Sequence, residues 1–343
     1  MRYIKVDLFL SEARTKPVID VRSPLEYAQG HYPGAINIPV FNDEERKIVG
    51  TKYKQVGREH AIMTGLEMVG PKLAEKVKLL KRLVNTKQLL VHCWRGGMRS
   101  NNMAWLFDLA GFEVNVLEGG YKVYRRFIRS KWDENRNYVV LGGKTGSGKS
   151  EVLEVMAKEG NQVLDLERIA LHRGSAFGNL ANDEQPTTEQ FENNLYEEWK
   201  DFKESEVIWL EDESRGIGKV SMPEMLHNHV RNNLVYFIDV PKEFRIQRLV
   251  EEYANFDEES LVAGVNRISK RLGGLNTKLS VEAIQNKDFS KAADILLSYY
   301  DKAYLKGLST RDQQKVIKIE TTTDDAKTNA DILLKKIGKP FKK

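Results

Sequence analysis

Hydrophobic residues along this chain of 343 residues form short runs that alternate with longer stretches of helical spacing. In the N-terminal part, strand-like runs at 16–24 (KPVIDVRSP), 88–93 (QLLVHC) and 113–121 (EVNVLEGGY) are predicted. Residues 100–112 (SNNMAWLFDLAGF) lie between the last two runs, have the spacing of a helix and stop at Gly111. Strands that alternate with helices are typical of parallel sheets, so the pattern predicts an α/β fold.

A second α/β series starts near residue 137. Its first strand is followed by a predicted helix at 149–160, which ends at Gly160. From Pro241 to the last residue the pattern is mostly helical. The strands predicted for this series are 137–143 (NYVVLGG), 162–167 (QVLDLE), 206–213 (EVIWLEDE) and 233–240 (NLVYFIDV).

The two series meet in a basic and aromatic segment, 121–136 (YKVYRRFIRSKWDENR). A chain of this length favours two domains, and we place them at 1–130 and 131–343. Helical spacing puts four cations on one face of the segment and large apolar side chains near the other. The cations are Lys122, Arg125, Arg126 and Arg129, and the apolar residues are Tyr121, Tyr124, Ile128 and Trp132.

Composition narrows the class of protein. Hydrophobic residues make up 41% and charged residues 30%, as in soluble globular proteins, and the net charge of +5 permits a nucleic-acid partner without requiring one. No apolar run is long enough to span a bilayer and no signal peptide is evident, so no membrane partner and a cytoplasmic location are expected. A single cysteine cannot form an internal disulfide, and the six histidines lack zinc-ligand spacing, so no structural metal is expected.

The single cysteine, Cys93, lies in VHCWRGGMRS (91–100), between a predicted strand and a predicted helix. Glycines in such a turn let backbone N–H groups point inward, and the helix adds the positive end of its dipole. Arg95 and Arg99 add full charges. All of these favour the thiolate, so the pKa of Cys93 is expected below the ordinary value of about 8.5. The alternative, a buried cysteine that only packs, leaves the glycines and arginines unexplained.

Cys93, Arg95 and Arg99 are therefore the candidate catalytic residues, with two reaction classes open. HCWRGGMRS satisfies the Cys-x5-Arg pattern of phosphatases, in which the cysteine forms a phosphocysteine. The same arrangement serves rhodaneses, in which the cysteine carries sulfur or selenium. A phosphatase fused to a nucleotide-binding module is therefore an alternative function.

The segment GKTGSGKS (143–150) matches the phosphate-binding pattern G-x-x-x-x-G-K-[ST] between a strand and a helix. Glycines allow the backbone to wrap phosphates and the lysine reaches the outer phosphates. Mg²⁺ is the expected cofactor, bound by the last serine. The candidate phosphate-binding residues are Gly143, Gly146, Ser147, Gly148, Lys149 and Ser150.

Acids at strand ends complete this predicted site. Asp212 is the preferred Mg²⁺-supporting acid in WLEDES, with Glu211 and Glu213 as alternatives. Asp165 and Arg173, in the segment DLERIALHRGSAFG, are further candidates for contact with Mg²⁺ or ligand.

The upstream segment DVRSPLEYAQGHYPGAINIP (20–39) resembles the rhodanese superfamily, a fold that some cell-cycle phosphatases share. Common single-domain rhodaneses place their loop arginine five residues after the cysteine, whereas Arg99 comes six after Cys93. A longer loop makes a wider cradle, which fits a phosphoester or selenophosphate.

The whole chain resembles the bacterial tRNA 2-selenouridine synthases, a rhodanese-like domain joined to a P-loop NTPase-like domain with a helical C-terminal part. The matching segments are ERKIVGTKYKQVG, CWRGGMRSNNMAWLF, GKTGSGKS, DLERIALHRGSAFG, WLEDESRGIG and RLGGLNTK. The last ~65 residues match weakly, and their role stays open.

The resemblance implies an enzyme that acts on tRNA carrying a wobble 2-thiouridine. Such a transferase geranylates the sulfur with geranyl diphosphate and then replaces the S-geranyl group with selenium from selenophosphate. It needs no organic prosthetic group, and an enzyme that supplies selenophosphate is an implied partner. The cations Lys122, Arg125, Arg126 and Arg129 become candidate tRNA contacts, and the P-loop is expected to bind geranyl diphosphate rather than ATP.

Overall fold

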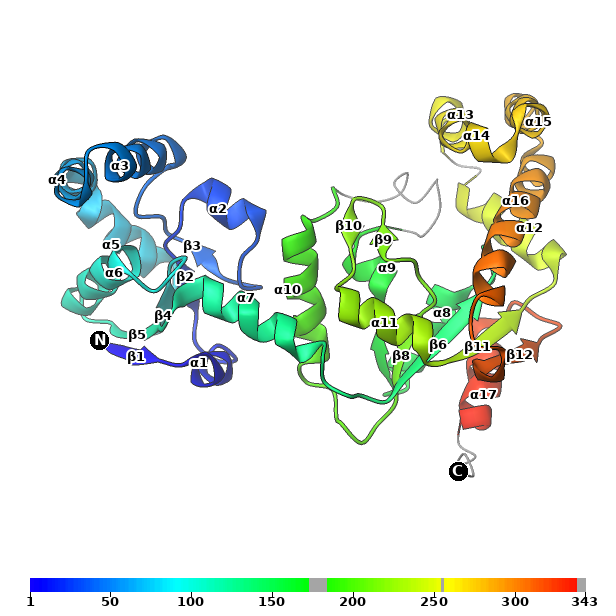
Figure 1. The fold of residues 1–343 in the computed structure, drawn as a ribbon, viewed down its shortest axis with the longest axis horizontal. Coiled ribbons are helices and arrows are strands. Elements are labelled where there is room, and N and C mark those ends of the chain that lie inside the picture. Colours follow the sequence, from blue (N-terminus) through cyan, green and yellow to red (C-terminus); the bar gives the residue numbers. More distant parts are fainter. Residues whose placement is uncertain (173–183, 254–255, 338–343) are drawn as a thin grey trace. The chain divides into compact units, whose positions relative to one another are not determined.

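The computed structural model describes residues 1–172, 184–253 and 256–337 (Figure 1). The chain divides into two compact units. The first contains Met1–Trp132 together with Glu192–Glu197, and the second contains Asp133–Phe191 and Glu198–Lys343. Residues 192–197, which the sequence assigned to the second domain, thus group with the first. Among the described residues, no helix is both long and apolar enough to cross a membrane.

The first unit is built on a parallel sheet with the strand order β1-β5-β4-β2-β3. Its strands are β1 (Arg2–Ile4), β2 (Val18–Asp20), β3 (Ile36–Asn37), β4 (Gln88–His92) and β5 (Glu113–Leu117). Its helices are α1 (Val6–Glu12), α2 (Pro24–Gln29), α3 (Asp43–Gln55), α4 (Arg58–Val69), α5 (Leu73–Leu83), α6 (Met98–Leu109) and α7 (Gly120–Lys131), with the 3-10 turn η1 (Gly70–Lys72).

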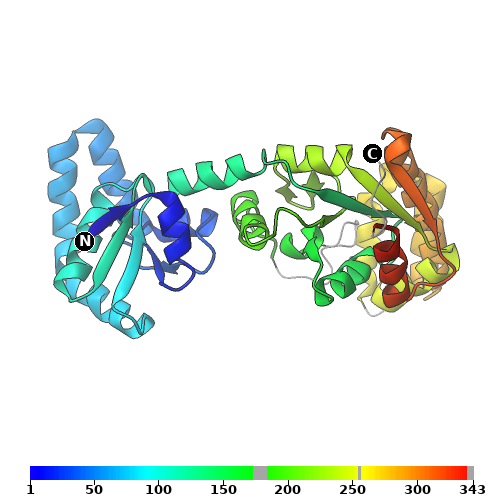
Figure 2. The ribbon, with the colours of Figure 1, turned by 90° about the horizontal axis from the view of Figure 1, so that it is seen from below.

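The sheet of the first unit forms the centre of its core. Residues 89–92 of β4 are all buried, as expected for a central parallel strand covered on both faces. Val91 and Val116 pack with Phe107 of α6 in one apolar cluster. Helices α3 and α4 pack against each other at the edge of this unit (Figure 2).

The second unit has a parallel sheet with the order β12-β11-β6-β8-β7 and a small antiparallel pair, β9 and β10. Its strands are β6 (Tyr138–Gly143), β7 (Gln162–Leu164), β8 (Ile208–Glu211), β9 (Gly216–Ile217), β10 (Val220–Ser221), β11 (Leu234–Asp239) and β12 (Val316–Glu320). Its helices are α8 (Lys149–Lys158), α9 (Leu166–Ile169), α11 (Glu224–Asn232), α12 (Lys242–Tyr253), α13 (Glu258–Arg267), α14 (Ser269–Leu272), α15 (Gly274–Gln285), α16 (Phe289–Ser309) and α17 (Ala326–Ile337), with the 3-10 turn η2 (Gln313–Lys315). Helix α10 (Thr188–Trp199) has residues in both units.

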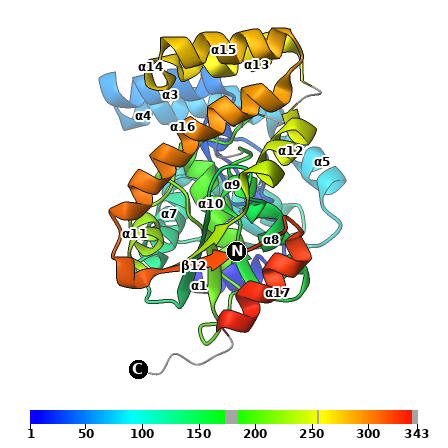
Figure 3. The same ribbon diagram turned by 90° about the vertical axis from the view of Figure 1, so that its right-hand side faces the viewer.

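The C-terminal region is an integral part of the second unit. Strand β12, which the sequence pattern did not predict, pairs with β11 along its whole length. Helix α17 packs on α8, and α13, α14 and α15 gather at one end of α16 (Figure 3). Removing the last part of the chain would therefore expose an edge of this sheet.

The basic helix α7 has the predicted register. Its apolar residues Tyr121, Tyr124 and Ile128 are buried, and Lys122, Arg126 and Arg129 are exposed. Arg125 differs from these three cations. It is only 13% exposed, forms an ion pair with Glu192 and donates a hydrogen bond of 2.6 Å to Asn193. Arg125 therefore forms its ion pair and this hydrogen bond within the first unit.

Candidate functional site

Cys93 lies directly after β4, in a turn fixed by two glycines with positive φ. Gly96 has φ +64°, and a Cβ there would lie 2.8 Å from the backbone nitrogen of Gly119. Gly120 has φ +60°, and its Cβ would lie 2.3 Å from the carbonyl oxygen of Cys93. The N–H of Tyr121 donates to that same oxygen at 2.9 Å. The loop after β5 thus supports the cysteine loop by close backbone contact that only glycine permits.

The surroundings of Cys93 favour the thiolate. Burial of the sulfur opposes ionisation, but hydrogen bonds from Ser100 and from the backbone N–H of Arg95, with the charge of Arg99, outweigh it and lower the pKa of Cys93. The Ser100 hydroxyl lies 3.2 Å from the sulfur. This agrees with the predicted direction, and it adds Ser100, which the sequence analysis did not select.

The two arginines of the loop take different positions. Arg95 is exposed, and its backbone contacts the cysteine. Arg99 forms a two-point ion pair with Glu26 of α2, with Nη2 3.1 Å from Oε1. Glu26 also accepts from the N–H of Ser23 at 3.1 Å and lies 3.6 Å from Arg46 of α3. Arg99 is thus held at the rim of the loop by an acid that also caps α2.

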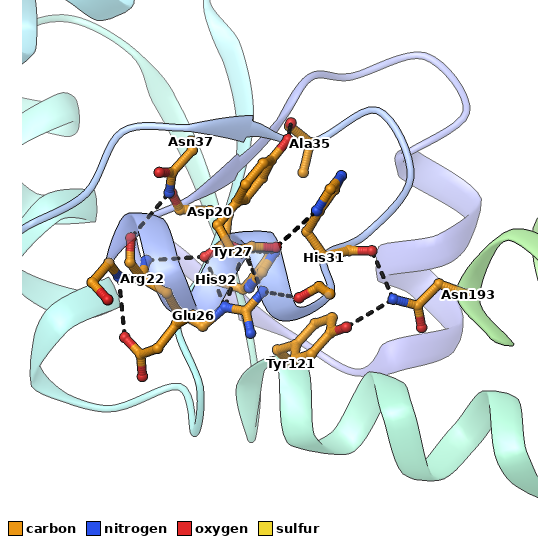
Figure 4. Close-up of polar contacts among 12 residues, drawn as sticks. Asp20, Arg22, Glu26, Tyr27, His31, Ala35, Asn37, His92, Tyr121 and Asn193 are labelled. Carbon is orange, nitrogen blue, oxygen red and sulfur yellow. Dashed lines mark hydrogen bonds and ion pairs between the residues drawn. The ribbon is translucent and has the colours of Figure 1, made fainter. Parts of the chain in front are cut away.

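A buried ion pair lies beside His92, the residue before Cys93 (Figure 4). Asp20 and Arg22 are 0% and 1% exposed, with Nη2 2.6 Å from Oδ2. Tyr121 packs its ring 3.9 Å from the guanidinium carbon of Arg22 and stacks on His92. Burial lowers the pKa of His92, so this ring stays neutral at neutral pH. The Asp-x-Arg pair of the sequence is therefore a structural support.

Asn193 extends this support and was missed by sequence reasoning. Its amide donates to the Tyr121 hydroxyl at 2.7 Å and to the carbonyl of His31 at 2.8 Å. The acidic composition of the surrounding stretch would favour a solvated helix face. Asn193 is instead fully buried and Glu192 is nearly so.

The predicted phosphate loop lies between β6 and α8 in the second unit. Gly146 and Gly148 have φ +75° and +74°, and Gly148 is the residue before the first turn of α8. A Cβ on Gly143 would lie 2.4 Å from the hydroxyl of the buried Ser147. Lys149 donates to the Gly143 carbonyl at 3.2 Å, so its amine lies across the loop. The geometry matches a polyphosphate-binding loop.

Of the acids predicted near the loop, the structure places Glu211 rather than Asp212 in contact with Ser150. The Ser150 hydroxyl donates to Glu211 at 3.1 Å and to Glu167 at 3.3 Å. Asp212 instead forms an ion pair with Arg311 and accepts from Tyr304 at 2.8 Å. Asp212 follows the last residue of β8 and lines the same cavity as the phosphate loop, although its carboxylate is paired with Arg311 and Tyr304.

The acids around the loop are strongly coupled to Lys149. Burial raises the pKa of Glu211 well above its ordinary range, and burial with the nearby Glu167 raises the pKa of Glu213 to about 8. Burial would lower the pKa of Lys149, but these acids outweigh it and raise that pKa. The lysine therefore stays charged.

Asp165 and Arg173 are the remaining predicted ligand contacts in this unit. Asp165 caps α9, where it accepts from the N–H of Arg168 at 2.9 Å, and burial raises its pKa. Arg173 lies outside the described residues. Among the residues that the structure describes, no group of three or more His, Cys, Asp or Glu side chains is arranged to hold a metal ion. A Mg²⁺ ion here would need phosphate oxygens and water as further ligands.

The phosphate loop opens into a cavity of about 970 Å³. One wall carries the loop and the acids Asp165, Glu167 and Glu213. Another part of the lining is aromatic and apolar and comes mainly from α16, with Tyr299, Tyr300, Ala303, Tyr304 and Leu308; α12 adds Leu249 beside the charged Arg248 and Glu252. The cavity therefore combines polyphosphate contacts with an apolar surface, as ligand sites commonly do.

Comparisons with known proteins agree with this architecture. The family model for the tRNA 2-selenouridine synthase AAA domain matches residues 136–330, and the model for the rhodanese-like domain matches residues 6–127. The tRNA 2-selenouridine synthase of Shewanella denitrificans is 34% identical over 343 residues, which cover 89% of this chain and 92% of that one. That of Pseudomonas syringae pv. syringae is 33% identical, with 94% and 95% covered.

The synthase of Nitrosomonas europaea is 39% identical over 255 residues, 72% of this chain. The match covers 65% of the Nitrosomonas protein, so the chain spans slightly less than two thirds of that relative's length.

The fold and the comparisons define a rhodanese-like domain, with its cysteine in a glycine-containing loop, joined to a P-loop domain. The predicted fold class is confirmed. With both domain models matched and relatives aligned along nearly their whole length, the chain belongs to the tRNA 2-selenouridine synthase family.

Proposed function

We propose that this protein converts wobble 2-thiouridine of tRNA to 2-selenouridine in two steps. In the first, the thiouridine sulfur attacks geranyl diphosphate: a carbon–sulfur bond forms, the carbon–oxygen bond breaks and diphosphate leaves. In the second, selenium from selenophosphate displaces the S-geranyl group. With water, the products are 2-selenouridine, geranyl thiol and phosphate. The observation that carries the proposal is the presence of two different anion sites, a thiolate loop and a polyphosphate loop beside an apolar wall.

The first step is assigned to the second unit. Lys149 would bind the diphosphate and offset the negative charge that grows on it as the carbon–oxygen bond breaks. Glu211, Glu167 and Ser150 present oxygen atoms together, the ligand type that Mg²⁺ prefers. When bound, Mg²⁺ would add positive charge at the leaving group. The aromatic and apolar side chains of α16, with Leu249 of α12, offer a surface on which a geranyl chain could pack.

The second step is assigned to the Cys93 loop. A tetrahedral anion such as selenophosphate suits a turn whose backbone N–H groups and arginines already stabilise a thiolate. Arg95 is exposed at the turn and can approach such an anion directly.

The test is mass spectrometry of nucleosides from thiolated tRNA after incubation with both small substrates. The Cys93→Ala variant is expected to accumulate S-geranyl-2-thiouridine without selenation. The Lys149→Ala variant is expected to lose geranylation by about a hundredfold or more, yet to selenate tRNA supplied already geranylated. Lys158→Ala, which removes an exposed cation of the same helix, is the control. Full selenation by Cys93→Ala, or geranylation that requires ATP, would contradict the proposal.

The Cys-x5-Arg spacing and the lowered pKa of Cys93 also favour a cysteine phosphatase. Hydrolysis of para-nitrophenyl phosphate that depends on Cys93, without any change in thiolated tRNA, would establish that alternative.

A further inference from the structure

The hairpin of α3 and α4 ends in an unusually exposed tip, residues 51–60 (TKYKQVGREH). Every residue of the tip except Gly57 is exposed to solvent. Helix α3 has no buried residue along its length, and Gly57 turns the chain with φ +120°. The tip therefore contributes little to the core of the first unit, and its composition needs another explanation.

The composition of the tip combines positive charge with exposed rings and apolar groups. The tip has three cations, Lys52, Lys54 and Arg58, and one acid, Glu59. Tyr53 is 59% exposed and Val56 is 56% exposed, although large apolar side chains are costly to leave in water. Cations interleaved with an exposed aromatic ring are the pattern by which proteins bind unpaired nucleotides: cations meet phosphates and rings stack on bases.

The base of the same hairpin is connected to the Cys93 loop. Arg46 of α3 contacts Glu26, the acid that holds Arg99. A Cβ on Gly50 would lie 2.7 Å from the Arg46 guanidinium, so the absence of a side chain there leaves room for that contact. Tyr53 follows Arg46 by seven positions, which is about 10 Å along a helix. The tip thus lies within a few nucleotides' reach of the cysteine loop.

We propose that the tip, residues 51–60, binds unpaired nucleotides next to the base that is treated at the Cys93 loop. This rests on the proposed function only in requiring that the substrate be an RNA. Tyr53 stacks on a base, and Lys54 and Arg58 contact phosphates. The tip is formed by the end of α3 and the start of α4, so it does not include the cations of α7.

Direct RNA binding tests the proposal in the full-length protein, with modification activity measured separately. The probes are a labelled anticodon stem–loop RNA and a fully paired RNA duplex of the same length, titrated by fluorescence anisotropy over a range of salt concentrations. Tyr53→Ala is expected to weaken stem–loop binding by about 5-fold to 100-fold, the range for loss of one stacked base. Tyr53→Phe retains the ring and is expected to bind nearly as well as the unaltered protein.

The double variant Lys54→Ala, Arg58→Ala is expected to reduce the salt slope of stem–loop binding by about 1.4, for two phosphate contacts of a single strand. Its control is Lys81→Ala, Arg82→Ala, which removes the same charge from exposed positions of α5. Circular dichroism of each variant checks folding.

Each outcome decides a different point. If the unaltered protein does not bind the stem–loop, the proposed function fails. If it binds, but the tip variants behave like the α5 control, the tip proposal is overturned. An equal effect of Tyr53→Ala on the duplex would also overturn it, since stacking requires unpaired bases. Displacement of the RNA by a poly-glutamate peptide that binds with the same affinity as the RNA would also overturn the proposal, because it would make the tip a protein-docking surface.

Discussion

Replacing Arg22 with methionine would leave a carboxylate buried without its partner. The Arg22 Nε lies 3.1 and 3.0 Å from the two oxygens of Asp20, and Nη2 also donates to the Gly30 carbonyl at 2.6 Å. Both side chains are almost completely buried. The substitution keeps a long apolar side chain against Tyr121 but removes every charged contact to Asp20.

The expected cost follows from the burial of Asp20. Breaking one member of a buried ion pair typically destabilises a protein by about 3–5 kcal/mol, because the remaining charge is desolvated and uncompensated. Replacing both members usually costs much less, so Asp20→Asn with Arg22→Met is expected to recover most of the loss. His92 cannot compensate at neutral pH, since burial keeps its ring uncharged.

The pH dependence has a defined sign. In the unaltered protein, burial alone would raise the pKa of Asp20, but His92, which is protonated only in acid, and the hydrogen-bonded Arg22 outweigh burial and lower it. The pair therefore stabilises the fold above the unfolded pKa of about 3.9 and loses that effect as pH falls through the lower folded-state value. In Arg22→Met, burial raises the pKa of Asp20, so protonation relieves the defect. The difference between the two proteins should narrow as pH falls.

Native-state hydrogen exchange with mass spectrometry measures this difference in the full chain. Peptides covering β2 and β4 report the local free energy of opening, whereas global unfolding of a chain with two units is not two-state. Arg82→Met on α5, an exposed arginine, is the control. A cost no greater than the control, or one that does not change with pH, would refute the assignment of this pair as a support of the cysteine loop.

Three further changes have expected outcomes. Ser100→Ala removes a hydrogen bond to the sulfur and should raise the pKa of Cys93. Cys93 is the only cysteine, so the pH–rate profile of its alkylation by iodoacetamide should shift toward higher pH. An unchanged profile would count against this contact. Tyr304→Phe leaves a buried backbone N–H and a carboxylate oxygen without this partner, so exchange in β6 should show a loss of about 1–3 kcal/mol, and unaltered protection would contradict it. Arg126→Ala should lower the salt slope of tRNA binding by about 0.7–0.9. Arg125→Ala should mainly weaken the first unit, because Arg125 is paired there. If Arg125→Ala lowered the salt slope and Arg126→Ala weakened the first unit, this interpretation would be reversed.

Sequence patterns predicted the parts of this protein whose chemistry depends on consecutive residues. The loops around Cys93 and Lys149 each follow a strand and precede a helix, so their geometry is encoded locally. The register of α7 was also predictable, because Tyr121 and Ile128 recur at helical spacing and are both buried. Strong local patterns thus predicted the positions of both loops and of helix α7.

The remaining features depend on residues far apart in the chain. Glu167 and Glu211 meet at Ser150 only because β8 lies beside β6 and β7 in the sheet. Asn193 reads as one polar residue in an acidic helix, and only its packing against Tyr121 shows its role. Strand β12 was missed because its partner β11 ends far earlier in the chain, and five residues of apolar alternation are a weak signal.

The two proposed anion sites differ in the charged groups that surround them. At Cys93 the protein supplies donors and an arginine, so negative charge on the sulfur is favoured before any ligand arrives. At the phosphate loop Lys149 lies among the buried acids Glu211 and Glu213, whose raised pKa values favour their neutral, protonated forms. A diphosphate would add negative charge to these buried acids, which raises their pKa values further and favours proton or cation uptake. Because the pKa of Glu213 is already about 8, protons are available near neutral pH. The second site would therefore hold its ligand beside protonated acids or a bound cation, whereas the first site supplies hydrogen-bond donors and an arginine.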